Sequence, residues 1–244
     1  GEVAVKLVPP RSGAFVDVTA GEAERLARLL HPRILGFVES GALPHPVSDC
    51  AAGTTYIVTE LVQGPSLEKV PAPSWRWVQE LTMQVLDGLG AAHARNIVHL
   101  DIKPANILLR TTAMPDVVIA DFGVSYSIPF DASDASHPFA GTPQYMAPEQ
   151  ITRSVVDFGP WTDIYALGAT IRTCMEGSPP PSSTKRRERD TMRPAVSAFK
   201  KRYSHALLEA VDWSMDIDPL LRPQNVEQLL EVLKKIRPTA YQTN

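Results

Sequence analysis

The chain has 244 residues, of which 44% are hydrophobic, and it carries a formal net charge of −3. A chain of this length can form one large domain or two small lobes, and its slightly acidic balance excludes a general electrostatic attraction to nucleic acid or to acidic membranes. No apolar run approaches the roughly 18 residues that cross a bilayer, and no charged-then-apolar leader opens the chain, so we expect a cytoplasmic domain with no membrane contact. The two cysteines lack metal-ligand spacing, and we expect them to be reduced thiols.

The first element in chain order is an alternating apolar segment at residues 2–8, EVAVKLV. Alternation of this kind predicts a half-buried strand, and Lys6 lies within it. A solvent-facing side chain is the commoner outcome for a single lysine in a strand. The strand pattern alone therefore does not single out Lys6.

A helix is predicted next, within residues 21–34. Glu22, Leu26 and Leu29 recur at positions i, i+4 and i+7, so they share one helical face. Because an unpaired buried carboxylate is costly, Glu22 on this face is expected to have a charged partner. Glu24 lies about 200° round the helix from Glu22, and we expect it to be a solvated surface acid.

Two further strands are predicted at residues 35–39 and 54–60, joined by an irregular segment. The apolar alternation then gives way to Gly64-Pro65, which indicates a turn or a hinge. A long helix follows, because Ser74 is a good capping residue and apolar side chains recur at helical spacing up to about residue 94. We expect this helix to be scaffolding.

The stretch HLDIKPANILL at residues 99–109 carries the strongest chemical signal. It places a carboxylate at Asp101, an amine at Lys103 and an amide at Asn106 between two apolar segments. A carboxylate can orient a hydroxyl and accept its proton, a cation can neutralise a travelling phosphoryl group, and an amide oxygen can ligate a hard metal ion. This spacing therefore suits phosphoryl transfer, and the alternative is a plain surface turn made by Lys-Pro-Ala-Asn.

Asp121 follows the next predicted strand, at residues 117–120, and precedes Phe122 and Gly123. An aspartate that leaves a buried strand before a flexible glycine can present its oxygens to a cation, although Asp-Phe-Gly alone is a common turn. The segment from there to Glu149 is rich in Ser, Asp and Pro and ends in GTPQYMAPE. Its composition is typical of a surface loop.

The remaining segments are predicted to be mostly helical. Amphipathic helices are expected at residues 203–215 and 225–236, and we assign them no chemistry. The segment at residues 178–194 is proline-rich and then strongly charged. We expect it to form a solvated excursion, with a docking patch for an acidic partner as the alternative.

Taken in order, the motifs Val-Ala-Val-Lys, His-Leu-Asp-Ile-Lys-Pro-Ala-Asn, Asp-Phe-Gly and Ala-Pro-Glu resemble those of eukaryotic-type Ser/Thr protein kinases, including bacterial ones. The resemblance implies an α+β fold with two lobes: a small lobe with a reduced antiparallel sheet at residues 1–62 and a mainly helical large lobe at residues 63–244. It also implies ATP and Mg²⁺ as cofactors, with Mn²⁺ as a substitute metal, and a protein substrate rather than a nucleic acid.

The resemblance implies a chemical role for five residues. Asp101 would accept the substrate proton, and Lys103 would steady the γ-phosphate. Asn106 and Asp121 would hold the metal. Thr142 would lie beside the catalytic residues and favour a serine or threonine acceptor.

Further residues would bind the nucleotide or support the site. Lys6, paired with Glu22, would contact the α- and β-phosphates. The residues implied to surround adenine are Ala4 in the roof, Leu108 in the floor, Thr59 as the gatekeeper, the carbonyl of Glu60 and the amide of Val62. The residues implied to be structural are His99, Glu149, Asp163 and Arg222. Among these, Asp163 would bind the catalytic-loop backbone and Arg222 would pair with Glu149.

The chain departs from the family pattern before Lys6. Kinases normally carry a glycine-rich hairpin there, which covers the β- and γ-phosphates, but five residues precede Lys6 in this sequence. We therefore expect an uncovered ATP cleft and an exposed edge at residues 3–8, able to pair with another chain. A kinase-fold pseudoenzyme that acts as a nucleotide-binding or scaffold module is the alternative function, and a small-molecule phosphotransferase is a third.

Leu100 is the second departure, because the family usually has arginine before the catalytic aspartate. That arginine ordinarily meets a phosphorylated residue of the activation segment. We therefore predict that activity does not depend on phosphorylation of this segment, which contains Ser133 and Ser136.

Overall fold

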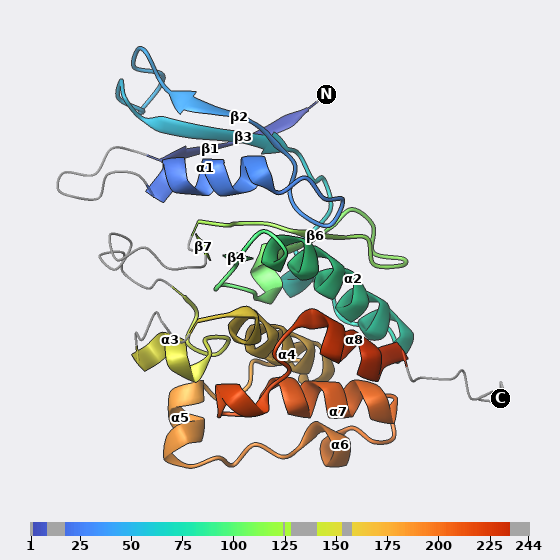
Figure 1. The fold of residues 1–244 in the computed structure, drawn as a ribbon. Helices are drawn as coiled ribbons and strands as arrows, with labels where there is room; N and C mark the ends of the chain where they lie inside the picture. The colour runs from blue at the N-terminus through green and yellow to red at the C-terminus, as the bar shows by residue number, and fades with distance from the viewer. Residues whose placement is uncertain (1, 9–17, 124, 128–140, 153–157, 235–244) are drawn as a thin grey trace.

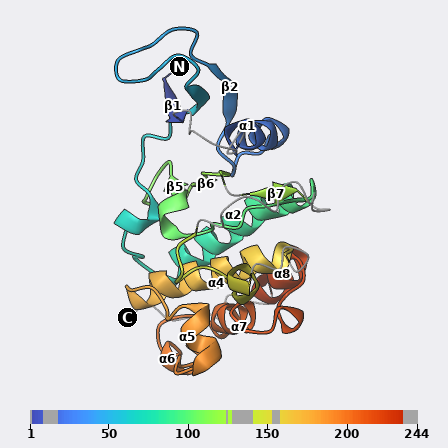
Figure 2. The ribbon, with the colours of Figure 1, turned by 90° about the vertical axis from the view of Figure 1, so that its left-hand side faces the viewer.

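The computed structural model describes residues 2–8, 18–123, 125–127, 141–152 and 158–234 of the chain. A small unit, made of a sheet and one helix, lies above a larger and mainly helical unit (Figure 1). A perpendicular view shows the same division, with short strands at the level where the units meet (Figure 2). The architecture is the α+β fold with two lobes that was expected.

The small unit is built on a three-stranded antiparallel sheet in the order β1-β3-β2. Strand β3 (Thr55–Glu60) is central, and β1 (Val3–Val8) and β2 (Phe37–Ala42) lie at the two edges of this sheet. The prediction for β2, residues 35–39, was wrong at both ends. After a register shift near its start, β2 stays paired with β3 as far as the first residue of β3, and this pairing extends the strand.

Helix α1 (Val18–Arg28) packs against the sheet with Glu22 on its buried side. The helix begins earlier than predicted and ends before the predicted boundary at residue 34. A proline at position 32 explains why the helix does not reach residue 34, because its ring disfavours a helical conformation in the preceding residue. Leu29 stays buried beyond the last turn.

The long predicted helix is α2 (Trp75–His93). Ser74 caps it, because its Oγ accepts a hydrogen bond from the amide of Trp77 at 3.2 Å. One face of the helix, including Leu81 and Leu89, is fully buried. This face supports the loops that lie between the two units.

Helix α4 (Pro160–Glu176) is central to the large unit, since it contacts both α2 and α7 (His205–Ser214) and most of its residues are buried. Helix α8 (Val226–Lys234) packs on α2 and α7. The helices predicted at residues 203–215 and 225–236 are thus present. Further helical elements include α3 (Pro148–Thr152), α6 (Ala195–Ala198), η1 (Leu67–Lys69) and η5 (Pro219–Leu221). Among the described helices, none is both long and apolar enough to cross a membrane.

Short strands frame the loops between the units. Strand β4 (Ile97–Val98) pairs with β7 (Tyr126–Ser127), and β5 (Ile107–Leu109) pairs with β6 (Val117–Ile119). The 3-10 turn η2 (Pro104–Asn106) lies between β4 and β5. The candidate catalytic loop is therefore held at both ends, and β6 leads directly into the Asp-Phe-Gly motif.

The charged segment at residues 178–194 is mostly exposed to solvent, as expected, but one of its charged side chains is buried. It contains helix α5 (Ser183–Glu188), in which Arg186 is only 7% exposed. Arg186 donates a hydrogen bond to the carbonyl of Met215 at 2.7 Å and pairs with Asp190. Because a guanidinium group has five donors, it can satisfy these acceptors together, and this charge is part of the core.

Glu149 and Arg222 form a buried ion pair between α3 and the end of η5. Nη1 and Nη2 of Arg222 lie 2.8 Å and 3.1 Å from the two carboxylate oxygens, and the side chains are 0% and 4% exposed for Arg222 and Glu149. The hydroxyl of Thr162 donates a further hydrogen bond to Glu149 at 2.9 Å. The contact implied by the resemblance is thus present, and it joins α3 to α4 and η5.

Arg222→Met should lower the free energy of unfolding by about 3 kcal/mol, because the Glu149 carboxylate would stay buried without its charged partner. Urea unfolding of the purified chain measures this loss. The double variant Arg222→Met/Glu149→Gln should recover part of it, since the unpaired charge is then removed. Equal stability of the single and double variants would show that the charge pair is not the cause.

Candidate active site

Asp163, in the first turn of α4, holds the loop at residues 99–106. Its carboxylate accepts hydrogen bonds from the amides of His99 at 2.8 Å and Leu100 at 2.7 Å, and it lies 2.8 Å from Nε2 of His93. Full burial acts to raise the pKa of Asp163, but the contacts with His93 and His99 outweigh it and lower the pKa below 3.8. The site is therefore built on a buried, ionised carboxylate.

His99 joins this loop to the Asp-Phe-Gly motif. Its Nδ1 accepts a hydrogen bond from the amide of Asp101 at 3.2 Å, so its Nε2 is the donor to the carbonyl of Ala120 at 3.0 Å. The ring also meets the edge of Phe122, with centroids 4.6 Å apart. The side chain is fully buried and is held by these contacts, which are those of a structural residue.

Leu100 lies in the left-handed backbone region, with φ of 65°. Such a conformation costs roughly 1–3 kcal/mol for a non-glycine residue, so it must be stabilised by its surroundings. Asp163 binds the amide of Leu100, and Nε2 of Gln150 donates to its carbonyl at 2.8 Å. The side chain is 3% exposed. Both backbone groups and the side chain of Leu100 are therefore fixed.

Asp101, Lys103 and Asn106 converge on one point. One carboxylate oxygen of Asp101, Oδ2, accepts from Nζ of Lys103 at 2.7 Å and from Nδ2 of Asn106 at 2.9 Å. The same amide nitrogen of Asn106 binds the backbone carbonyl of Asp101 at 2.9 Å. The Asp101 side chain is 10% exposed. A carboxylate held this way is oriented and keeps a cation beside it, as proton acceptance next to a phosphoryl group requires.

Lys6 connects the small unit to this site. Its Nζ lies 2.9 Å and 2.8 Å from the two oxygens of Glu22 and 3.1 Å from Oδ1 of Asp121. Burial acts to lower the pKa of Lys6, but Glu22 and Asp121 outweigh it and raise the pKa above 10.5. Burial likewise acts to raise the pKa of Asp121, but Lys6 outweighs it and lowers the pKa below 3.8. Lys6 and Asp121 are thus charged at neutral pH.

Asn106 and Asp121 offer the oxygen ligands that a magnesium ion prefers. The amide of Ala120 donates to the carbonyl of Asn106 at 2.9 Å, which brings the two side chains to one place. Nδ2 of Asn106 is bound to Asp101, so its Oδ1 is the atom that can face a cation, while the Asp121 side chain is 49% exposed. Since Mg²⁺ uses one or two carboxylates together with phosphate oxygens and water, these residues fit it. In the part of the chain that the structure describes, no three His, Cys, Asp or Glu side chains form a separate metal site.

The residues expected around adenine come from both units. Ala4 of β1 pairs with Thr59 of β3, and the Thr59 hydroxyl donates to the carbonyl of Glu60 at 3.2 Å. Leu108 of β5 forms a bridge with Ser66, just after the hinge. The three expected residues are thus connected: strand pairing joins Ala4 to Thr59, and the chain from Thr59 runs to the bridge between Ser66 and Leu108. Binding of adenine by these residues and by Val62 stays a prediction.

Thr142 lies in the described segment at residues 141–152. Its carbonyl accepts hydrogen bonds from the amides of Tyr145 at 2.9 Å and Met146 at 3.3 Å. Its expected position beside the catalytic residues stays a prediction. Ser133 and Ser136 lie outside the described residues.

Two supporting contacts were not predicted from the sequence. Arg25 of α1 donates to the Ser125 hydroxyl at 2.7 Å, and this hydroxyl donates to the carbonyl of Phe122 at 2.6 Å. Arg25 lies three residues after Glu22, so helical spacing could have placed both on one face. Its partner lies 100 residues away, and nothing in the sequence marks it. The contact of Gln150 with the Leu100 carbonyl likewise had no sequence signal.

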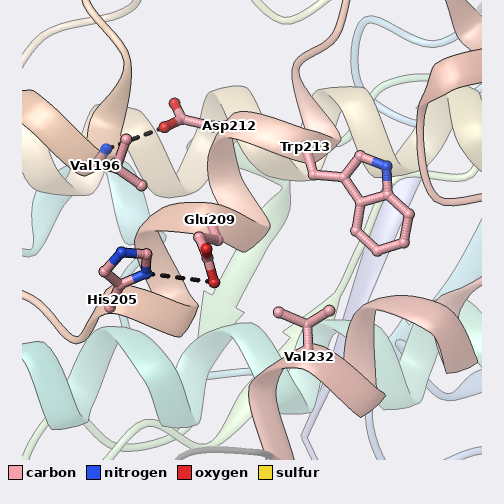
Figure 3. Close-up of a pocket in the computed structure, with 6 residues that line it drawn as sticks. All are labelled: Val196, His205, Glu209, Asp212, Trp213 and Val232. Carbon is pink, nitrogen blue, oxygen red and sulfur yellow. Dashed lines mark hydrogen bonds and ion pairs between the residues drawn. The ribbon is translucent and has the colours of Figure 1, made fainter.

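A separate hollow of about 470 Å³ lies between α6, α7 and α8 (Figure 3). It is lined by Val196, His205, Glu209, Asp212, Trp213 and Val232. Its acidic groups already have partners: Glu209 lies 3.3 Å from His205, and Asp212 accepts from the amides of Ala195 and Val196. It shares no residue with the catalytic motifs, and we assign it no chemistry.

Comparison with known proteins gives a consistent picture. The family model described as protein kinase domain matches residues 1–243. Mitogen-activated protein kinase kinase kinase 6 of Homo sapiens is 32% identical over 185 residues, which are 73% of this chain and 14% of that protein. Serine/threonine-protein kinase PknB of Mycobacterium leprae is 32% identical over 190 residues, which are 73% of this chain and 29% of that protein.

The solved structures include a similar fold. The structure titled PpkA-294 apo form matches with a TM-score of 0.69 and 29% sequence identity, and the match covers 88% of this chain and 73% of that one. The curated relatives are much longer proteins, since the matched segments span less than a third of each of those named above.

Asp163→Asn should destabilise the protein in a pH-dependent way. Because folding lowers the pKa of Asp163, its contribution to stability is full above its ordinary value of 3.8 and is lost as pH falls through the folded value. The difference in unfolding free energy between wild type and Asp163→Asn should therefore be constant near neutral pH and shrink below about pH 4. Urea unfolding at each pH measures it, with Asp49→Asn, a change at an exposed aspartate, as the control. A difference that did not change with pH would contradict this.

Proposed function

The chain belongs to the protein kinase family, and we propose that it transfers the γ-phosphate of ATP to a serine or threonine hydroxyl of a protein. The observation that carries this proposal is the geometry around Asp101, whose Oδ2 is held by Lys103 at 2.7 Å and by Asn106 at 2.9 Å. The lysine of the Asp-Ile-Lys-Pro-Ala-Asn sequence also favours a serine or threonine acceptor, because tyrosine kinases typically lack it.

In this proposal Asp101 orients the acceptor hydroxyl and takes its proton as the phosphoryl group leaves ATP. Lys103 keeps a positive charge beside that carboxylate and steadies the γ-phosphate. Asn106 and Asp121 hold Mg²⁺, or Mn²⁺ in its place. When bound, the metal supplies charge neutralisation of the phosphates.

The small unit would position the nucleotide. Lys6 would bind the α- and β-phosphates while Glu22 keeps its ammonium group in place. We assign residues 1–62 to the small lobe and residues 63–244 to the large lobe, with Thr142 positioning the substrate in the latter.

Partners and location follow from the sequence prediction. We propose that this domain acts on a protein substrate in the cytoplasm. We propose no contact of this domain with nucleic acid or with a membrane. Self-association through residues 3–8 is also proposed, because β1 is an edge of the described sheet and Val3, Val5 and Leu7 are about half exposed.

Independence from activation-segment phosphorylation is supported by contacts that need no phosphate. Leu100 has no charge to offer a phosphate, yet its backbone is fixed by Asp163 and Gln150. Arg25 ties α1 to Ser125, next to the Asp-Phe-Gly motif. Helix α1, which carries Glu22, is therefore held toward the Asp-Phe-Gly motif without any phosphorylation.

Asp101→Asn should reduce phosphate transfer from ATP to a generic protein substrate by at least about a thousandfold, because the proton acceptor is lost. Lys6→Met should reduce it strongly as well, with weaker nucleotide binding. Lys201→Met, a change at an exposed lysine, is the matched control and should behave as wild type. A radioactive ATP assay measures all three.

The assay also tests the alternative function. Wild-type protein that bound Mg²⁺–ATP without any transfer would contradict the enzyme proposal and would support a nucleotide-binding scaffold. Equal transfer by wild type and Asp101→Asn would instead point to a contaminating kinase.

Ser133→Ala and Ser136→Ala, tested one at a time, should each retain activity within about twofold of wild type, because no basic side chain at position 100 awaits a phosphate. Phosphatase-treated wild-type protein should also keep its initial rate. Steady-state assays with a protein substrate measure both. A loss at either serine as large as that of Asp101→Asn would contradict the proposal.

A further inference from the structure

Glu60 directly follows the proposed gatekeeper Thr59, and two different segments of the chain bind its carboxylate. Oε1 accepts a hydrogen bond from the amide of Gly36 at 2.9 Å, and Nη2 of Arg110 lies 2.9 Å from both carboxylate oxygens. Gly36 belongs to the segment that follows α1, whereas Arg110 follows β5 in the large unit. The carboxylate therefore ties the end of β3, just before the hinge at Gly64-Pro65, to both units.

Arg110 is itself fixed in place. Its Nη1 donates to the carbonyl of Pro32 at 3.0 Å, and its backbone amide donates to the carbonyl of Asp116 at 2.9 Å. The Asp116 carboxylate pairs with Arg33, which lies next to Pro32. Charges of alternating sign thus run from Glu60 through Arg110 and Asp116 to Arg33, across three segments that are distant in the sequence.

The hinge lies directly against strand β5 at this place. The amide of Leu109 donates to the carbonyl of Pro65 at 3.0 Å. At Gly64, an added Cβ would lie 1.7 Å from the carbonyl oxygen of Leu109, so only glycine fits this close approach. Arg110 follows Leu108 by two residues, and the proposed adenine floor and the partner of Glu60 are therefore on one short stretch of chain.

We propose that Arg110 is a positioning residue for the nucleotide. It fixes Glu60, whose backbone carbonyl is the proposed acceptor for adenine, at a set height above Leu108, and it does so without touching the nucleotide. This inference rests on the proposed function. Its consequence is that the Arg110–Glu60 pair controls nucleotide affinity rather than the rate of phosphoryl transfer.

The size of the effect follows from the exposure of the pair. The side chains of Arg110 and Glu60 are 33% and 34% exposed, so solvent and salt weaken their attraction. Arg110→Met should raise the Kd for ADP and the KM for ATP by roughly threefold and leave kcat unchanged. The difference from wild type should fall as NaCl is raised to about 0.5 M.

The experiment uses a fluorescent ADP analogue with Mg²⁺ for binding and steady-state phosphorylation of a generic protein for KM and kcat. Arg110→Lys should restore most of the affinity, because a single ammonium group can still pair with Glu60. Glu60→Gln keeps an acceptor for Gly36 but loses the charge, and it should match Arg110→Met; it carries the test if Arg110→Met does not fold. Arg95→Met, at an exposed arginine at the end of α2, is the control.

The double variant Arg110→Met/Glu60→Gln should be no weaker than either single variant, since both remove one interaction. Additive losses would overturn the proposal, as would unchanged ADP affinity in Arg110→Met or a loss confined to kcat. Wild-type protein that binds no nucleotide would overturn the proposed function as well. Wild-type binding with equal binding by the variants would overturn only the role of Arg110.

Discussion

The buried carboxylate of Asp163 is the interaction on which the rest of the site depends. Taking a charge out of water costs several kcal/mol, and here two backbone amides and His93 offset that cost. The amides belong to the two residues that precede Asp101, so the direction of the Asp101 carboxylate is set by a helix most of whose residues are buried. Leu100 can stay in a left-handed conformation only because this carboxylate and Gln150 hold its backbone.

Long-range polar contacts then set the relation between the two units. Lys6 meets Asp121 across 115 residues of sequence, and Arg110 meets Glu60 across 50. Apolar packing joins the units without regard to direction, whereas these contacts fix particular atoms at particular distances. The phosphate-binding and adenine-binding ends of the proposed site are therefore held separately, one by Lys6 and the other by Arg110.

The sequence predicted those parts of the structure that depend on local pattern or on ordered motifs. Helix α2 was predicted with its capping residue, because helical periodicity is a local property. The extent of β2 was not, because a register shift depends on the partner strand. The burial of Arg186 was missed for a related reason: a charged run indicates solvent unless its acceptors are known, and the carbonyl of Met215 lies 29 residues further on. Gln150 and Arg110 carry no motif, so their contacts could only come from coordinates.

Leu100 shows how the site can differ from its family without losing its geometry. An arginine at this position would need an anionic partner, and a phosphate added to the activation segment could supply one. A leucine needs only an apolar environment, and it is 3% exposed here. Since the backbone of the same residue is fixed by Asp163 and Gln150, the shape of the loop does not depend on which side chain stands there. The side chain at this position would then decide only whether the loop responds to a phosphate from outside it, and with leucine there we propose that the loop does not respond.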